Sequence, residues 1–153
     1  MATQYHRDGQ LAQWQYGNGI VRSIIRNARG MPDRVQDTYG STAFHDFYYD
    51  YDANGNVSGI TDQSDDGVQG RQDRAFLYDG LNRLLQASAP GMWGMATYEY
   101  DPLDNLRMAT VGARAYSYSY GATNRQGVVW HGGQEIRPGN GNARQGCKIT
   151  RQR

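Results

Sequence analysis

The sequence has very little lysine, one cysteine, few prolines and no long apolar run. Lys148 is the only lysine among 153 residues, and the formal net charge is +1. A chain this close to neutrality lacks the basic surface typical of nucleic-acid-binding domains, so we do not expect a nucleic acid as its partner. Cys147 has no second cysteine to pair with, which excludes an internal disulfide. No segment approaches the roughly 20 apolar residues needed for a membrane-spanning helix.

The first residues of this sequence do not resemble a secretory leader. Residues 1–15 contain no apolar segment like the core of a signal peptide. We therefore expect a cytoplasmic protein if this chain is produced alone, and export would need a different signal or route.

The residue types that carry catalysis or metal binding are scattered along the chain. His6, His45 and His131 are far apart and show no zinc-ligand spacing. No serine lies in a nucleophile motif such as Gly-x-Ser-x-Gly, and His45-Asp46 is expected to be a strand or turn pair instead of a catalytic dyad. We therefore expect no enzyme activity, no cofactor and no zinc.

Tyrosine and glycine are abundant, with 12 and 20 residues respectively. Tyrosine favours strands, and glycine favours tight turns. No segment shows a sustained helical period with capping residues. The composition predicts an all-β fold of strands joined by tight turns.

A short motif recurs along the chain. Its four copies occupy residues 49–60, 76–84, 98–106 and 118–125, and a weaker copy occupies residues 26–31. The anchoring tyrosines are Tyr51, Tyr78, Tyr100 and Tyr120, which are 27, 22 and 20 residues apart. Internal similarity at this period is typical of repeat proteins.

Each copy of the motif predicts a β-hairpin. A Tyr-x-Tyr pattern places two aromatic rings on one face of a strand. The next residue, usually Asp, can open a turn through its side chain, and three residues later comes a Gly, Asn or Asp, which tolerate a left-handed backbone. Together these features describe a type I turn followed by one left-handed residue. The predicted turn residues are Asp52, Gly55, Asp79, Asn82, Asp101, Asp104 and Asn124. The predicted strand aromatics are Tyr49, Tyr51, Tyr78, Tyr98, Tyr100, Tyr118 and Tyr120.

Two segments between the copies are expected to be loops. Residues 61–72 are polar and acidic, and residues 87–96 contain Pro90 and several glycines. The apolar side chains of the second loop are expected to pack against a sheet; they are Met92, Trp93 and Met95.

The composition changes after residue 125. Residues 126–153 are rich in Gly, Asn, Gln and Arg and have too little apolar surface to fold alone. We therefore divide the chain into a repeat sheet, residues 1–125, and a disordered tail, residues 126–153. Residues 128–130 form a small apolar island and are a candidate for one last strand.

A calcium loop is the main competing interpretation of the first copy. Asp50, Asp52 and Asn54 with Gly55 match the opening positions of an EF-hand loop, but Thr61 stands where the closing Glu is needed. The flanking residues alternate as in strands instead of forming helices. The spacing follows from the repeat turn alone, which leaves these three residues as a weak calcium candidate.

These motifs resemble the YD-repeat of RHS proteins and teneurins. The residues that carry the resemblance are Tyr49-Asp50-Tyr51-Asp52-Ala53-Asn54-Gly55-Asn56-Val57, Tyr78-Asp79-Gly80-Leu81-Asn82-Arg83-Leu84 and Tyr100-Asp101-Pro102-Leu103-Asp104-Asn105-Leu106. The similarity covers about residues 14–125.

The resemblance implies a curved, twisted sheet of antiparallel hairpins that forms part of a hollow β-shell. In bacterial members such shells often enclose a C-terminal toxin, and secretion systems, notably type VI, deliver them. The resemblance therefore implies a secreted or cell-surface location and, as partners, other YD repeats and a toxin cargo.

Two features depart from the family pattern. Family shells contain many more repeats than this sequence. Bacterial shells also usually end in a motif with paired Asp-Pro units around a glycine, and nothing after Arg125 matches it. The segment Asp101-Pro102-Leu103-Asp104 is superficially similar to this motif, but the third repeat turn explains its sequence better.

Three functions follow from these observations. The leading one is a non-catalytic segment of a YD-repeat shell that encapsulates or displays a cargo. The second is a carbohydrate- or protein-binding β module that uses exposed Tyr and Trp. The third is a small toxin whose activity lies in the tail. Because a short run of repeats leaves unpaired sheet edges, we also expect self-association.

Overall fold

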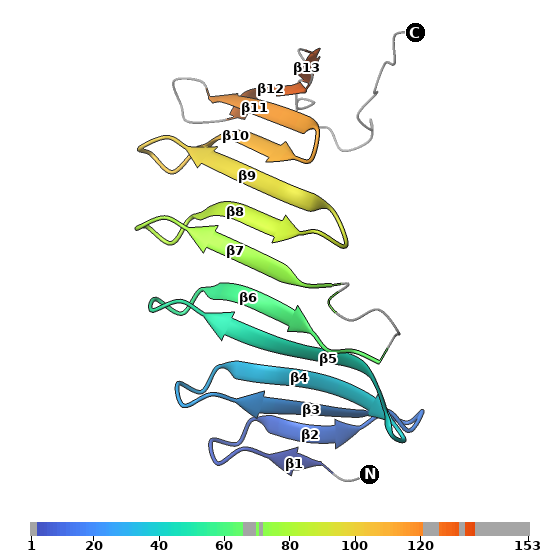
Figure 1. Cartoon of the computed structure of the whole chain (residues 1–153). Helices are drawn as coiled ribbons and strands as arrows, with labels where there is room; N and C mark the ends of the chain where they lie inside the picture. Colours follow the sequence, from blue (N-terminus) through green and yellow to red (C-terminus); the bar gives the residue numbers. More distant parts are fainter. Residues whose placement is uncertain (1–2, 66–69, 71, 121–125, 132–133, 137–153) are drawn as a thin grey trace, which may run out of the picture. The chain divides into compact units, whose positions relative to one another are not determined.

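The structure is a computed structural model that describes residues 3–65, 70, 72–120, 126–131 and 134–136. The described residues contain thirteen strands and no helix. The strands form one open antiparallel sheet in which the strand order is the sequence order, β1 to β13 (Figure 1). This confirms the predicted all-β fold of consecutive hairpins.

The chain divides into two compact units, Met1–Ala96 and Thr97–Arg153. The strands of the first unit are β1 (Gln4–Tyr5), β2 (Leu11–Gln15), β3 (Val21–Arg26), β4 (Pro32–Tyr39), β5 (Thr42–Tyr51), β6 (Val57–Asp62), β7 (Arg74–Tyr78) and β8 (Leu84–Ala89). Strand β9 (Gly94–Tyr100) crosses the boundary. The strands of the second unit are β10 (Leu106–Val111), β11 (Arg114–Tyr120), β12 (Gln126–His131) and β13 (Gln134–Ile136).

The sheet continues beyond the boundary expected at residue 125. Residues 128–130 lie in β12, which pairs with β11 and β13. Backbone pairing with a neighbouring strand can hold a segment whose composition would not fold alone. Residues 137–153 of the expected tail lie outside the described residues.

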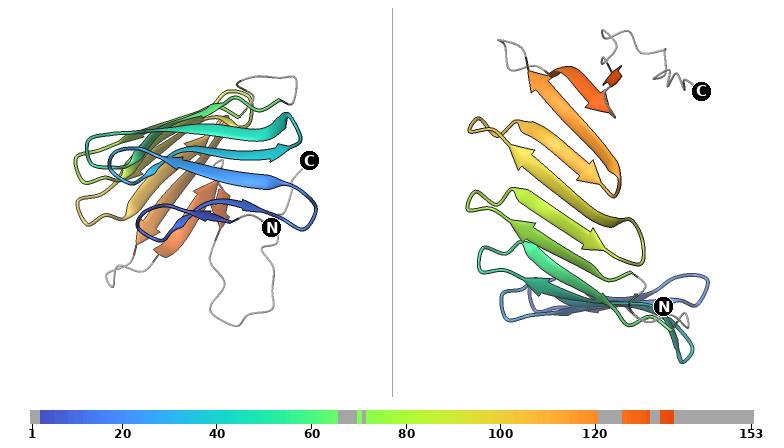
Figure 2. Two further views of the ribbon diagram at one scale, coloured as in Figure 1. Left: turned by 90° about the horizontal axis from the view of Figure 1, so that it is seen from below. Right: turned by 45° about the horizontal axis from the view of Figure 1, so that its top comes forward.

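The first unit is a twisted single layer. Figure 2 shows how the strand direction turns from β1 to β8 (Figure 2), as the handedness of strands requires. Among the described residues no second layer covers either face of these strands. Each side chain is therefore shielded only by its neighbours on the same face.

The pairing register defines the two faces of the first unit. One row across the sheet is Ile24–Val35–Phe47–Asp62, and the rows beside it on the same face contain Trp14, Tyr49 and Ile60. We call this side the aromatic face. Along each strand the intervening residues point the other way, including the row Gln13–Ser23–Gln36–Asp46. We call that side the polar face.

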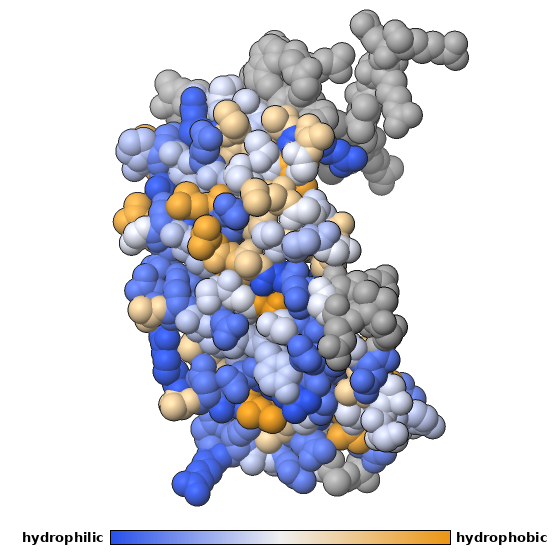
Figure 3. Space-filling view, in the orientation of Figure 1, coloured by the Kyte–Doolittle hydropathy of each residue, from blue (hydrophilic) through white to orange (hydrophobic). Residues whose placement is uncertain are grey.

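Burial is concentrated on small side chains and one ring. The buried hydrophobic residues are Phe47, Ala87, Ala89, Ala96 and Ala109. Phe47 is 6% exposed because His45 packs edge-on against its ring, with 4.4 Å between the ring centres, and the Arg74 guanidinium lies 5.7 Å from its centre. Many larger apolar side chains remain exposed. On the face in view in Figure 3, strongly apolar side chains gather at the left, near the turn that joins β7 to β8 (Figure 3).

The prediction of a loop over residues 87–96 was wrong. Residues 87–89 belong to β8 and residues 94–96 to β9, so the connection is only residues 90–93. The alanines at 87, 89 and 96 are buried within the sheet, which is why a segment without bulky strand formers still pairs. The prediction that Met92, Trp93 and Met95 pack against the sheet was also wrong, since they are 49%, 39% and 52% exposed.

Candidate functional site

The predicted turns share one backbone geometry. The Asp52 N–H donates to the Asn56 carbonyl at 2.9 Å, and the Gly55 N–H donates to the Asp52 carbonyl at 3.2 Å. The turns that begin at Asp79 and Asp101 repeat both bonds at distances between 2.9 and 3.1 Å. We call this five-residue unit the YD turn.

The fourth residue of each YD turn has a left-handed backbone. The φ angles of Gly55, Asn82 and Asp104 are 93°, 63° and 64°. Asn82 and Asp104 are the positive-φ residues other than glycine among the described residues. These angles agree with the turn that the sequence predicts. Asn124, the corresponding residue of the fourth copy, lies outside the described residues.

The Asp side chain closes the turn from inside. The Asp79 Oδ1 atom accepts hydrogen bonds from the N–H groups of Leu81 and Arg83, both at 2.9 Å. The Asp52 carboxylate accepts from the N–H and the side-chain amide of Asn56, both at 2.9 Å. These donors favour the charged carboxylate, so the pKa of both Asp79 and Asp52 is lowered.

Three more YD turns lie closer to the N-terminus. They begin at His6, Tyr16 and Asn27 and have both backbone bonds, with distances between 2.7 and 3.0 Å. Their fourth residues are Gly9, Gly19 and Gly30, with φ angles of 82°, 88° and 79°. Sequence analysis anticipated the Asn27 turn as a weak copy but missed the other two. A glycine followed two residues later by Leu11 or Val21 was the signal that could have identified them.

The tyrosine before the YD turn has a specific role. The Tyr51 hydroxyl donates to the Pro32 carbonyl at 2.6 Å, and the Tyr78 hydroxyl donates to the Val57 carbonyl at 3.0 Å. Pro32 and Val57 are each the first residue of the return strand of the preceding hairpin. The hydroxyl therefore bridges consecutive hairpins at the strand ends, and we call each such place a hairpin junction.

The second unit contains the same bond. The Tyr120 hydroxyl donates to the Leu106 carbonyl at 3.0 Å, and Leu106 begins β10. The first junction of the first unit uses a different residue. There Arg26 stands in the tyrosine position and donates to the Asp8 carboxylate at 2.7 Å and to the Gln10 side-chain oxygen.

Neighbouring YD turns of the first unit also contact one another. Arg29, in the Asn27 turn, donates to the carbonyls of Asp52 and Ala53 at 3.1 and 3.3 Å. Asn54, in the Asp52 turn, donates to the Asn82 side-chain oxygen at 2.9 Å. The third residue of one turn thus reaches the next turn, and the turns form a hydrogen-bonded row.

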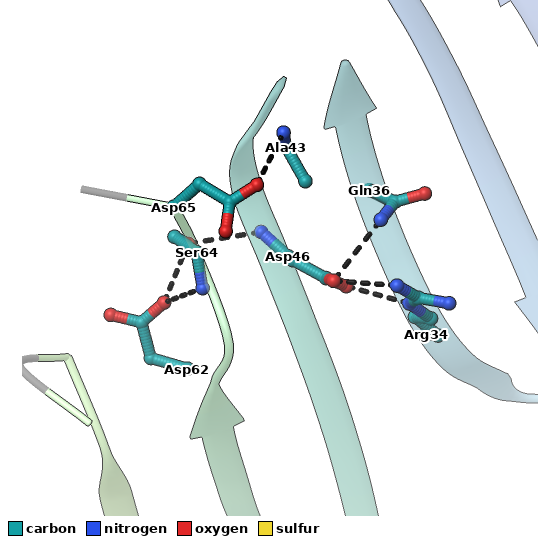
Figure 4. Close-up of polar contacts among 7 residues, drawn as sticks. All are labelled: Arg34, Gln36, Ala43, Asp46, Asp62, Ser64 and Asp65. Carbon is teal, nitrogen blue, oxygen red and sulfur yellow. Dashed lines mark hydrogen bonds and ion pairs between the residues drawn. The ribbon is translucent and has the colours of Figure 1, made fainter. Parts of the chain in front are cut away.

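A polar cluster lies where β5 meets the end of β6. The Arg34 guanidinium binds both oxygens of the Asp46 carboxylate at 2.6 and 2.5 Å, and Gln36 donates to the same carboxylate at 3.1 Å (Figure 4). The Asp46 N–H donates to the Ser64 Oγ atom at 3.0 Å, and this hydroxyl donates to Asp62 at 2.5 Å. Each carboxylate therefore has partners, as buried charged groups require.

This cluster holds the segment after β6 against β5. The Asp65 N–H donates to the Ala43 carbonyl at 2.7 Å, and the Ala43 N–H donates to the Asp65 carboxylate at 3.1 Å. Burial opposes ionisation of Asp62, but hydrogen bonds from Ser64 and Gln72 outweigh burial, so the pKa of Asp62 is lowered. The role of the cluster is thus to anchor the chain as it leaves the sheet.

His45 and Asp46 do not form a dyad. They are adjacent in β5 and therefore point to opposite faces. His45 Nδ1 lies 3.4 Å from the Asp37 carboxylate, which is already paired with Arg22. The Arg22 hydrogen bonds lower the pKa of Asp37.

The weak calcium candidates have separate neighbours. The Asp52 carboxylate accepts a hydrogen bond from Asn56, and the Asn54 amide donates to Asn82. The Asp50 carboxylate lies beside Gly59. Within the part of the chain that the structure describes, no group of three His, Cys, Asp or Glu could hold a metal ion.

An open groove of about 580 Å³ on the polar face is lined by Arg34, Asp46, Tyr48, Asp50, Thr61 and Gln63.

The remaining predicted residues fall into two groups. The predicted aromatics all lie in strands: Tyr49 and Tyr51 in β5, Tyr78 in β7, Tyr98 and Tyr100 in β9, and Tyr118 and Tyr120 in β11. Cys147 and Lys148 lie outside the described residues. The described ranges contain no helix with the length and apolar character that crossing a membrane requires.

No protein-family profile and no curated protein matches the sequence. Solved structures do match the fold. A crystal structure of TcdB2-TccC3 without its hypervariable C-terminal region is 17% identical and covers 82% of this chain, with a TM-score of 0.69. A second crystal structure of TcdB2-TccC3 is 14% identical and covers 89%, with a TM-score of 0.60. A structure of the Photorhabdus luminescens Tc holotoxin pore is 17% identical and covers 86%, with a TM-score of 0.53. This chain spans 8%, 10% and 6% of the length of those chains.

Proposed function

We propose that this chain is a non-catalytic wall segment of a YD-repeat shell. The observation that carries the proposal is the hairpin junction, in which a tyrosine hydroxyl binds the first carbonyl of the preceding return strand. The junction recurs in both units with the same geometry, so further hairpins could be added to the sheet in the same way. The likeness in fold to the TcdB2-TccC3 chains supports this reading.

Burial also favours a wall over an independent module. A wall is completed by neighbouring repeats and by what it encloses, so it needs no second layer of its own. In the first unit the aromatic face has no covering layer among the described residues, and its large apolar side chains apart from Phe47, such as Trp14, Tyr49 and Ile60, are only half-buried. Apolar surface that remains partly exposed is available for contact with another surface. We propose that the enclosed or displayed cargo is a toxin, as in the shells that the motifs resemble, and that the assembly acts outside the producing cell.

The test is electron cryo-microscopy of the assembly that contains the chain, purified through an affinity tag from cells that produce it. We expect density in which these strands continue into further strands and the sheet encloses a cavity. A free monomer with sharp, cooperative unfolding would contradict the proposal and favour an independent β module.

The alternative of carbohydrate stacking is less well supported. Tyr48 is the aromatic residue of the groove on the polar face, but the Arg34 guanidinium lies 4.9 Å from its ring centre and covers one side. A glycan screen of the purified chain tests this alternative. The toxin alternative is tested by expressing the chain with and without residues 126–153, because toxicity that depends on these residues would support it.

A further inference from the structure

The first strand of the sheet contains a tyrosine in the hairpin-junction position. Tyr5 directly precedes the His6 turn, as Tyr51 precedes the Asp52 turn and Tyr78 the Asp79 turn. The hydroxyls of Tyr51 and Tyr78 are bonded to a return strand. Tyr5 is 63% exposed, and its hydroxyl has no hydrogen-bond partner among the described residues.

Strand β1 lies at one end of the strand order and pairs only with β2. Its other side is therefore an edge that offers backbone N–H and C=O groups to an added strand. We propose that the β1 edge with Tyr5 is a docking site for the return strand of a YD hairpin that lies outside residues 1–153. The Tyr5 hydroxyl would donate to the carbonyl of the residue five positions after the start of that hairpin's turn.

The neighbouring turn adds a second requirement for the partner. Inside this chain the third residue of a YD turn reaches the following turn, as Arg29 does when it donates to the carbonyls of Asp52 and Ala53. The corresponding carbonyls at the β1 edge are those of His6 and Arg7. A donor side chain such as Arg or Asn at the third turn position of the partner would bind them.

The expected occupant is thus a YD hairpin with an extended return strand and a hydrogen-bond donor at the third turn position. This choice rests on continuity, because the same interface already joins β4 to β5 and β6 to β7 within the chain. The inference rests on the proposed wall function and specifies the chemistry of its partner.

A fluorescein-labelled peptide of residues 46–62 is the probe, since it contains the Asp52 hairpin with Asn54 at the third turn position. Its binding to the full chain is measured by fluorescence anisotropy, and protection of the β1 amides by hydrogen exchange. We compare the natural chain with Tyr5→Phe and with Tyr39→Phe. Tyr39 is the matched control, because it is also 63% exposed but precedes a different turn.

We expect saturable binding that Tyr5→Phe weakens roughly two- to tenfold, the effect of one hydrogen bond, while Tyr39→Phe leaves it unchanged. Absence of binding to the natural chain, binding equal to that of a scrambled peptide, or equal binding by the Tyr5→Phe chain would each overturn the inference. These results are distinguishable from failure of the wall function, since a shell seen by microscopy with an unimportant Tyr5 would refute only this site.

Discussion

The fourth position of the YD turn sets the strictest requirement on a single residue. At Gly55 the backbone has a φ of 93°, and a Cβ atom built there would lie 3.3 Å from the Arg29 guanidinium. The same position accepts Asn82 and Asp104, whose short polar side chains tolerate this conformation better than other residues do. Turn identity therefore depends on backbone tolerance more than on any one amino acid.

Gly55→Val should lower the free energy of unfolding by about 2 kcal/mol, because a β-branched residue is strained at positive φ. The measurement is the urea midpoint followed by circular dichroism. Gly80→Ala in the Asp79 turn is the control, since Gly80 has ordinary φ and an added Cβ meets nothing within 4 Å. Equal stability of the two variants would argue against a left-handed requirement at Gly55.

Acid should destabilise the sheet through its paired carboxylates. Arg22 lowers the pKa of Asp37, and turn hydrogen bonds lower the pKa of Asp52 and Asp79. Below the ordinary value of 3.8 the unfolded chain binds more protons than the folded one, so this stabilisation is present above pH 3.8 and is lost as pH falls through the lowered values. Urea midpoints measured from pH 7 to pH 2.5 should fall most steeply below pH 4. Asp37→Asn should be less stable at pH 7 and lose less stability on acidification.

The sequence predicted the Asp turns because three copies share a tyrosine, an aspartate and a left-handed residue at fixed spacing. It did not predict the turns at His6 and Tyr16, because neither begins with Asp, although both keep the glycine and the His6 turn also keeps the preceding tyrosine. The hydrogen bonds that the tyrosine hydroxyls make at the hairpin junctions could not be predicted either. They join residues 14 to 21 positions apart, and such bonds depend on which strands pair and in what register.

At the scale of elements, the junctions β4–β5 and β6–β7 each combine strand pairing, a tyrosine hydroxyl and a contact between turns. The contribution of the tyrosine hydroxyl is clearest between β6 and β7, where backbone pairing is short. Only two residue pairs, Gly59–Ala75 and Ile60–Arg74, define the register of these strands. The Tyr78 hydroxyl binds Val57 beyond the end of this short ladder. Where pairing is short, the side-chain bond closes the gap between hairpins.

Tyr78→Phe should therefore cost about 1 kcal/mol in stability, because it leaves the Val57 carbonyl without this donor. Tyr39→Phe, at an exposed site, should change the unfolding free energy by less than about 0.5 kcal/mol. Both are measured by urea denaturation. Hydrogen exchange should also increase at the β6–β7 pairing in Tyr78→Phe, and unchanged exchange there would show that the hydroxyl is dispensable.

Phe47 is the central ring of the aromatic face, held by His45 and Arg74. Phe47→Ala should reduce stability by about 3 kcal/mol, as truncation of a buried ring does. Phe44→Ala is the control in the same strand, since Phe44 is exposed. If thermal unfolding is similar for both variants, packing on the aromatic face contributes little to the fold.

For the whole molecule, the described residues leave unpaired edges at β1 and β13 and an uncovered aromatic face. Such edges recruit other chains. The purified chain should therefore associate with increasing concentration, as measured by light scattering after size exclusion. A particle mass equal to that of one chain over the whole range would contradict this prediction.

A sheet in which each hairpin contacts only its neighbours behaves as a one-dimensional chain of coupled units. Its stability is then a sum of terms for single hairpins and for junctions, and unfolding proceeds inward from the ends instead of occurring all at once. Each added hairpin contributes one more junction, so long arrays gain resistance to unfolding from their length. The tyrosine hydroxyls at the junctions contribute to the coupling between neighbouring hairpins, together with strand pairing and turn contacts, and replacing them would make unfolding of the array less cooperative.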